Sequence, residues 1–281
     1  MTPRIRDEEQ SNMYPIATAP SQLYGAYIFD IDGTISLDDV ALPTVPETIA
    51  SLRALGRRTL FLSNNTTRNV AAYGARLTAL GIPTPPDEVV NASQVLVRYL
   101  GHELPGATLH VLGEPPLIED LLAAGFCLSG RADEIDAVIA SFDRTLAYPK
   151  LQLAFDAIRG GARFFATNAD RYCPTVGGGQ PDAAAVIAAI EACTGVTCET
   201  IVGKPSTLTV DYVLERAGLP RHQCIMIGDR LETDIEMANR AGMASALVLT
   251  GATSVSAARD SLIRPTYLLR TLRDVLPEEY R

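Results

Sequence analysis

Two aspartates separated by one residue stand at the end of an apolar segment near the N-terminus. The segment reads Tyr27-Ile-Phe-Asp-Ile-Asp-Gly-Thr34, and its apolar residues predict a buried strand. Alternate residues of a strand point to the same side, so Asp30 and Asp32 are expected to face one site. Carboxylates crowded in this way raise each other's pKa unless they share a proton or a cation. A divalent metal ion would remove that cost, and Gly33 supplies the freedom that a tight turn needs.

Three further segments place polar side chains directly after a short apolar run. One carries small hydroxyl and amide groups suited to phosphate oxygens, one carries a lysine that can act as a point charge on phosphate, and one carries two acids. In chain order these residues are Ser63, Asn64, Lys204, Asp229 and Asp234. Together with the first pair, they describe a site that binds phosphate and a metal ion.

The elements that would position these residues alternate between strand and helix. Strands are expected at 26–29, 59–62 and 244–249, and helices near 47–55, 70–80, 93–100, 207–216 and 233–242. Such alternation predicts a parallel sheet covered on both faces, and strands buried twice are apolar on both sides. Active sites of these sheets lie beyond the carboxyl ends of the strands, where the polar residues fall.

The strand and helix pattern begins again between about Leu104 and Cys198. New strands are expected at 109–112, 137–140 and 163–166, with helices near 117–124 and 151–159. The pattern predicts a second α/β unit inserted into the first. Gly177-Gly-Gly179 lacks the spacing of a nucleotide-binding loop and is interpreted as a flexible cap or hinge loop.

The composition is that of a globular protein with an acidic surface. Hydrophobic residues make up 47% of the 281 residues and charged residues 20%, which excludes a disordered chain. The net charge of −9 argues against a nucleic-acid partner. The uncharged stretch 241–258 is too rich in small polar residues for a membrane span. Five cysteines without paired spacing favour free thiols and a cytoplasmic location.

The ordered motifs resemble those of the haloacid dehalogenase-like (HAD) phosphohydrolases, from about Ala26 onward. The long insert between Asn65 and Lys204, and Gly228-Asp-Arg-Leu-Glu-Thr-Asp-Ile235, resemble the type IIA subgroup, which includes nitrophenyl-phosphatase-like, phosphoglycolate and sugar-operon phosphatases. The resemblance implies a Rossmann-like parallel-sheet core with an inserted α/β C2-type cap. The core would comprise residues 1–103 and 199–281, with 1–24 as a flexible extension, and the cap residues 104–198.

The resemblance also implies a chemical role for each acid. Asp30 would attack phosphorus and form an aspartyl-phosphate, and Asp32 would protonate the leaving alcohol and later take a proton from water. Mg²⁺ would be held by the carboxylates of Asp30 and Asp229 and by the backbone carbonyl of Asp32. Asp234 would fix a water or Lys204, although an acid at a helix N-terminus also needs no catalytic role.

The remaining site residues follow from the same resemblance. The phosphoryl group would be bound by Ser63, Asn64, Lys204 and the backbone through Gly33. In the cap, Asp170 and Arg171 within Thr167–Pro174 are candidate contacts of the leaving group. The expected substrate is a small phosphorylated metabolite, such as a sugar, polyol or short acid phosphate. A homodimer through the cap is a further expectation.

Two alternatives to the phosphatase remain at the level of the sequence. A phosphomutase would use the same acids but keep the phosphate on the substrate. A catalytically idle, phosphate-sensing binding protein would retain the acids without using them. A metal-free dehalogenase is disfavoured because Asp32 and Asp229 would have no role in it.

Overall fold

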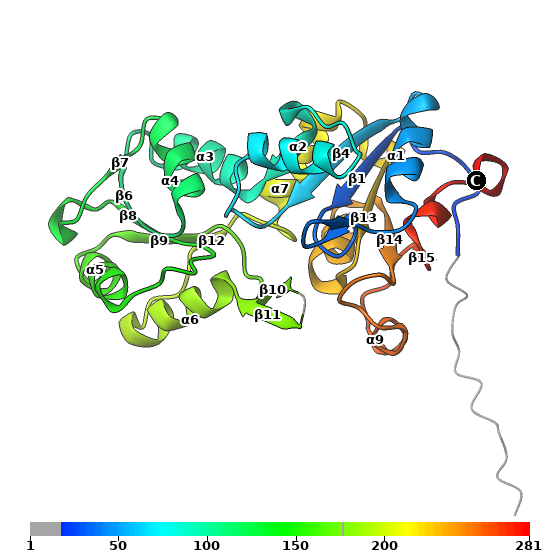
Figure 1. Ribbon diagram of the computed structural model, residues 1–281. Helices are drawn as coiled ribbons and strands as arrows, with labels where there is room; N and C mark the ends of the chain where they lie inside the picture. The colour runs from blue at the N-terminus through cyan, green and yellow to red at the C-terminus, as the bar shows by residue number, and fades with distance from the viewer. Residues whose placement is uncertain (1–17, 176) are drawn as a thin grey trace, which may run out of the picture.

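The computed structural model describes residues 18–175 and 177–281 and contains two parallel sheets placed side by side (Figure 1). The first sheet has six strands in the order β15-β14-β13-β1-β4-β5, and all its neighbouring strands pair in parallel. In that order the strands are Tyr267–Leu269, Ala244–Val248, Cys224–Gly228, Ala26–Asp30, Arg58–Ser63 and Val89–Asn91. The expected parallel α/β fold is confirmed.

Helices cover both faces of the first sheet because its central strands are apolar on both sides. Tyr27 and Phe29 of β1 pack into one buried cluster with α1 and α2, and Ile28 packs into another with α3 and α7. These helices, with α8 and α9, are Val45–Ala54, Val70–Ala79, Ala92–Glu103, Thr207–Ala217, Glu236–Ala241 and Val255–Asp260.

The second sheet has five parallel strands in the order β12-β9-β8-β6-β7. In that order they are Thr200–Ile201, Arg163–Ala166, Ala137–Ala140, Thr108–Leu112 and Cys127–Leu128. Its helices α4, α5 and α6 are Pro115–Ala123, Tyr148–Arg159 and Ala183–Thr194. One face packs on α5 and α6 through Val138 and Phe164, whereas Ile139 belongs to the cluster of α3 and α4.

The two units share one apolar cluster. It contains Ile28 of the first sheet and Phe165 of the second, and the ring of Tyr99 on α3 packs edge-on against Phe165 at 5.7 Å. The strand β12 completes the second sheet, although its residues fall in the range 199–281 assigned above to the core. The division of the chain into domains stays a prediction.

An antiparallel hairpin lies between the two units (Figure 1). Its strands β10 and β11 are Tyr172–Thr175 and Gly178–Pro181. The interpretation of Gly177–Gly179 as a flexible loop was therefore wrong for Gly178 and Gly179, which pair with Thr175 and Pro174 in a regular ladder. The hairpin is held by backbone hydrogen bonds, which glycine forms as well as any other residue. The side-chain pattern therefore gave no indication of a strand here.

Most of the expected N-terminal extension lies outside the described residues, since the description begins at residue 18. Tyr24 packs against the first sheet, and its hydroxyl lies 2.9 Å from that of Tyr267. No helix within residues 18–175 and 177–281 has the length and apolar character of a membrane span. Short elements complete the description: β2 and β3 at Ser36–Leu37 and Val40–Ala41, 3-10 turns at Pro86–Glu88, Ala132–Glu134, Arg221–Gln223, Leu272–Val275 and Glu278–Tyr280, and a π-helical turn at Leu231–Ile235.

Candidate active site

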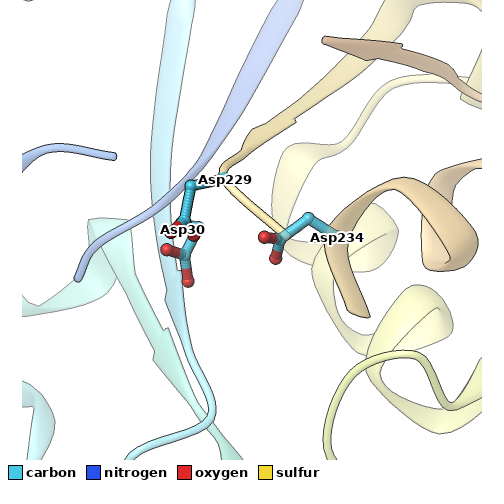
Figure 2. Close-up of side chains that lie close together, drawn as sticks. All are labelled: Asp30, Asp229 and Asp234. Carbon is cyan, nitrogen blue, oxygen red and sulfur yellow. The ribbon is translucent and has the colours of Figure 1, made fainter. Parts of the chain in front are cut away.

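Asp30 of the first pair and both acids of the last motif meet at the carboxyl ends of neighbouring strands. Asp30 is the last residue of β1, and Asp229 directly follows β13, which pairs in parallel with β1. Asp234 comes from the turn that follows Asp229, and Figure 2 shows its carboxylate turned toward the other two. One oxygen from each of the three acids lies within 4.8 Å of the others. The adjacent strand ends therefore build an acidic cluster.

Lys204 joins this cluster from the segment after β12. Its Nζ donates to Oδ1 of Asp30 at 2.5 Å and to Oδ1 of Asp234 at 2.7 Å, and the lysine is 3% exposed. Burial alone would lower the pKa of Lys204, but the charges of Asp234 and Asp30 raise it above its ordinary value. The lysine is thus held as a buried cation.

Asp229 and Asp234 are buried with like charges beside them. Burial raises the pKa of both carboxyl groups above the ordinary aspartate range, and Asp30 raises both further. The Oδ2 of Asp229 accepts from the backbone N–H of Ala252 at 2.6 Å. Its Oδ1 is buried without a hydrogen-bond partner among the described residues. A buried carboxylate oxygen without a donor is costly unless a cation binds it.

Glycines make room for this crowding. Gly33 has a φ of +96°, in the left-handed region, and a Cβ built there would collide with the carboxylate of Asp229. Gly251 lies as close to Asp229 on another side. The helix expected near 233–242 begins instead at Glu236, and Thr233 lies inside the π-helical turn Leu231–Ile235. That turn brings Asp234 back, so that its Oδ2 accepts from the N–H of Arg230 at 3.1 Å.

The carboxylate of Asp32 lies apart from the three clustered acids. Its Oδ1 is 3.3 Å from Nη1 of Arg76, and Nη2 of the same arginine donates to Oγ of Ser36 at 3.0 Å. Burial raises the pKa of Asp32 above its ordinary value, and the Arg76 charge opposes that rise. The Asp32 side chain is thus paired with Arg76, and it lines the same cavity as Asp30. Arg76 sits on α2, and nothing in the sequence indicated this partner.

A small cavity of about 40 Å³ lies against these groups. From the first unit it is lined by Asp30, Asp32, Ser63, Asn64, Asn65, Lys204, Arg230 and Thr233, and from the second by Asp170, Tyr172, Cys173, Pro174 and Asp182. The structure therefore brings Asp30, Asp170 and three of the phosphate-binding candidates, Ser63, Asn64 and Lys204, to one cavity. The fourth phosphate-binding candidate, Gly33, does not line this cavity, and neither do Asp229 and Asp234.

Asn64 is already engaged by the protein. Its Oδ1 accepts from the N–H of Lys204 at 2.8 Å, and its Nδ2 donates to Oδ2 of Asp170 at 3.1 Å. The side chain thus positions the lysine and ties the two units together. A direct contact of Asn64 with phosphate, expected from the resemblance, stays a prediction.

The cap candidates occupy different places. Asp170 lines the small cavity, whereas the exposed Arg171 lines only a neighbouring cavity of about 400 Å³. Arg230 lines both cavities. Its Nη2 donates to the backbone oxygen of Tyr172 at 3.0 Å, and its guanidinium lies over the Tyr172 ring at 5.2 Å. The role expected for Arg171 stays a prediction.

Two cavity-lining residues escaped the reasoning from sequence. Arg230 directly follows Asp229 in a motif that was singled out, but its contacts come from the hairpin β10–β11. Asp182 is the N-cap of α6, and its position before an apolar helix was the only available signal. Both lie where two units meet, and a motif within one unit does not indicate such a place.

Comparison with known proteins identifies the family. Residues 27–127 match the haloacid dehalogenase-like hydrolase family, and residues 201–275 match the HAD-hydrolase-like family. Sugar-phosphatase AraL of Bacillus subtilis is 37% identical over 88% of this chain and 90% of its own length. Phosphoglycolate phosphatase 1A, chloroplastic, of Arabidopsis thaliana is 32% identical over 95% of this chain and 83% of its own length.

Solved structures agree with this result. The 4-nitrophenylphosphatase of Thermotoga maritima superposes with a TM-score of 0.85 at 33% identity, covering 89% of this chain and 95% of its own. The p-nitrophenyl phosphatase of Archaeoglobus fulgidus gives a TM-score of 0.84 at 30% identity, covering 90% and 98%. The chain therefore belongs to the haloacid dehalogenase-like hydrolases, and within them to the type IIA phosphatases that its motifs resemble.

Proposed function

We propose that this protein is a Mg²⁺-dependent phosphatase that hydrolyses small phosphorylated metabolites, namely sugar, polyol or short acid phosphates, through an aspartyl-phosphate on Asp30. One observation carries the proposal. Asp30 lines a cavity in direct contact with the buried ammonium of Lys204, and the acids Asp229 and Asp234 stand behind it. A nucleophile, a fixed positive charge and a place for a metal ion are what phosphoryl transfer requires.

The acidic cluster fits a divalent cation. Three carboxylates face one ammonium group, and Oδ1 of Asp229 has no donor among the described residues. The carboxylates of Asp30 and Asp229 and the backbone carbonyl of Asp32 would hold Mg²⁺, which prefers hard oxygen ligands. Bound there, the ion neutralises charge on the phosphate oxygens. Asp234 remains with Lys204, to which it is already bonded.

The residues of the chain divide the chemistry between them. A carboxylate oxygen of Asp30 forms a bond to phosphorus while the ester P–O bond breaks, and Asp32 gives its proton to the departing alcohol oxygen. Asp32 then takes a proton from the water that attacks phosphorus, which releases inorganic phosphate and restores Asp30. Lys204 and Ser63 stabilise the charge that spreads over the phosphoryl oxygens.

An assay with an aryl phosphate tests this proposal. Release of inorganic phosphate is expected with Mg²⁺ and not with a chelator, and Asp30→Asn should lower kcat/KM by about a thousandfold or more with the fold intact. Asp211→Asn, an exposed acid on α7, is the matched control and should leave the rate unchanged. Activity of Asp30→Asn within about tenfold of the parent would contradict the assignment.

The same assay separates the two alternatives. A phosphomutase would convert a sugar phosphate without releasing inorganic phosphate. A phosphate-sensing protein would bind phosphate, show no turnover with any substrate, and leave no phosphoenzyme in a rapid quench.

The setting of the enzyme is part of the proposal. The five cysteines are free thiols, which supports a reducing cytoplasm. The partner is the small substrate, without nucleic acid or membrane as a ligand. A homodimer through residues 104–198 is also proposed, and sedimentation of the parent protein and of a cap-surface variant would test it.

A further inference from the structure

The part of the cavity wall that the second unit contributes is acidic. It contains Asp170 and Asp182, from the segment after β9 and from the start of α6, and neither has a place in the chemistry above. Asp182 is 3% exposed although it lines the cavity. A leaving group attached to phosphorus at Asp30 would extend toward these two acids.

The two acids are held in place by Asn168. Its Nδ2 lies 3.4 Å from Oδ2 of Asp170 and 3.4 Å from Oδ1 of Asp182, and it also donates to the backbone oxygen of Asn64 at 3.2 Å. The position of both carboxyl groups is therefore built into the junction between the two units. This arrangement is a fixed site, because Asn168 and Asp182 are buried, Asp170 is partly buried, and Asn168 bonds both acids.

Asp182 retains an oxygen for a ligand. Asp182 accepts two side-chain hydrogen bonds from described residues, one from Nδ2 of Asn168 and one from the N–H of Ala183. Both go to its Oδ1. Its Oδ2 accepts none among the described residues. Burial raises the pKa of Asp182 to about 7, the Ala183 N–H opposes that rise, and the Asp170 charge adds to it. The group thus gains from any donor that enters the cavity.

Charge decides which donor fits. A carboxylate on the leaving group would meet two acids and be repelled. Arg230, a cation that lines the cavity, already faces Asp170 at 3.9 Å and donates to the backbone oxygen of Tyr172. A hydroxyl group carries no charge, donates to Oδ2 of Asp182 and accepts from its proton when Asp182 is neutral.

We propose that Asp182 and Asp170 form a subsite that reads hydroxyl groups of the leaving group, so that the enzyme takes sugar or polyol phosphates and rejects phosphates of short acids. Asp182 is the specificity-determining residue of this subsite, and Asn168 positions it. The inference rests on the proposed phosphatase activity and narrows its substrate class.

Three substrates with one skeleton test the proposal in the parent enzyme with Mg²⁺. They are 2-hydroxyethyl phosphate, 2-phosphoglycolate and O-phosphoethanolamine, which end in a hydroxyl, a carboxylate and an ammonium group. The kcat/KM of the hydroxyl substrate should exceed that of the carboxylate substrate by at least about tenfold. Equal or inverted values would overturn the proposal. Preference for the ammonium substrate would overturn it too, because the subsite would then read a cation.

The variant Asp182→Asn tests whether Asp182 causes the preference for the hydroxyl substrate. The amide keeps an acceptor for the Ala183 N–H but removes the charge, so the ratio of kcat/KM between the hydroxyl and carboxylate substrates should fall by about fivefold or more. Asp136→Asn is the matched control, since Asp136 also accepts from a backbone N–H, that of Thr108, but lies outside this cavity. A ratio that Asp182→Asn leaves unchanged would remove Asp182 from the subsite.

An aryl phosphate distinguishes failure of this inference from failure of the proposed function. If the parent does not hydrolyse the aryl phosphate, the phosphatase itself is refuted. If it hydrolyses the aryl phosphate but prefers 2-phosphoglycolate, only the hydroxyl-reading subsite is refuted.

Discussion

The burial of Asp229 supports its proposed role as a ligand of the metal ion. Its Oδ1 has no hydrogen-bond donor within the described part of the chain, and burial with neighbouring Asp30 and Asp234 raises its pKa. Asp229→Asn should therefore raise the Mg²⁺ concentration for half-maximal activity by about tenfold or more, since a neutral amide is a weaker ligand for a hard cation. Excess Mg²⁺ should recover part of the rate.

Thermal unfolding gives a second measurement of the same change. Mg²⁺ should raise the melting temperature of the parent and of Asp211→Asn, but raise that of Asp229→Asn much less, because a ligand stabilises only the state that binds it. Equal shifts in all three proteins would exclude Asp229 as a ligand.

The contribution of Asp32 to the rate of hydrolysis is predicted to depend on the leaving group. Asp32→Ala should slow hydrolysis of an alkyl phosphate by roughly a hundredfold or more, because an alkoxide needs a proton to depart. An aryl phosphate should lose less, since a phenolate departs without one. The measurement compares kcat/KM for both substrates in parent and variant. Equal losses would assign Asp32 to a step that both substrates share, and rapid-quench trapping of the phosphoenzyme would identify it.

Asp182, the N-cap of α6, is buried, and its negative charge lowers the stability of the folded protein. Asp182 has a folded-state pKa of about 7, whereas an unfolded aspartate titrates near pH ~4. Between these values the folded protein holds a proton that the unfolded chain has lost. Stability from this group therefore falls as the pH rises through that window and stays lost above it.

A cap-preserving substitution measures this effect. Asn caps helices as well as Asp, so Asp182→Asn should match the parent near pH ~4 and melt several degrees higher at about pH 8. Asp136→Asn should show no such trend. A constant difference across the pH range would mean that the Asp182 charge is already compensated in the folded protein.

The arrangement of the two units determines which substrates can reach Asp30. The cavity of about 40 Å³ lies beside contacts between the units, including Asn64 with Asp170 and Arg230 with Tyr172. We therefore expect the site to take a small molecule that the cap can cover and to exclude a polymer.

Phosphotyrosine and a peptide that contains it test this exclusion, because the same phosphate ester bond is cleaved in both substrates. The free amino acid should have a kcat/KM at least about a hundredfold above that of a ten-residue phosphopeptide. The comparison is made under identical Mg²⁺ and pH. Comparable values would show that catalysis does not require the cap to close.

Much of the site follows from local rules. Asp30 and Asp229 were expected together because strands apolar on both sides form parallel sheets, and the ends of neighbouring parallel strands meet. The strands Ala137–Ala140 and Arg163–Ala166 were predicted with the observed bounds. These features depend on residues close in the chain, and their patterning carries the information.

Contacts between distant segments were settled only by the folded chain. Examples are the contact of Arg76 with Asp32, the contact of Arg230 with the hairpin, and the place of Asp182 in the cavity. The residues that meet there are far apart in the sequence and show no regular spacing. The hairpin β10–β11 likewise escaped prediction, because its glycines pair through the backbone alone. The strand motifs thus determine the acids and the lysine that we propose to act at phosphorus, which are assembled at the edge of one sheet. The packing of the second unit against that edge decides which groups face the leaving group, since it depends on surfaces formed only after both sheets exist.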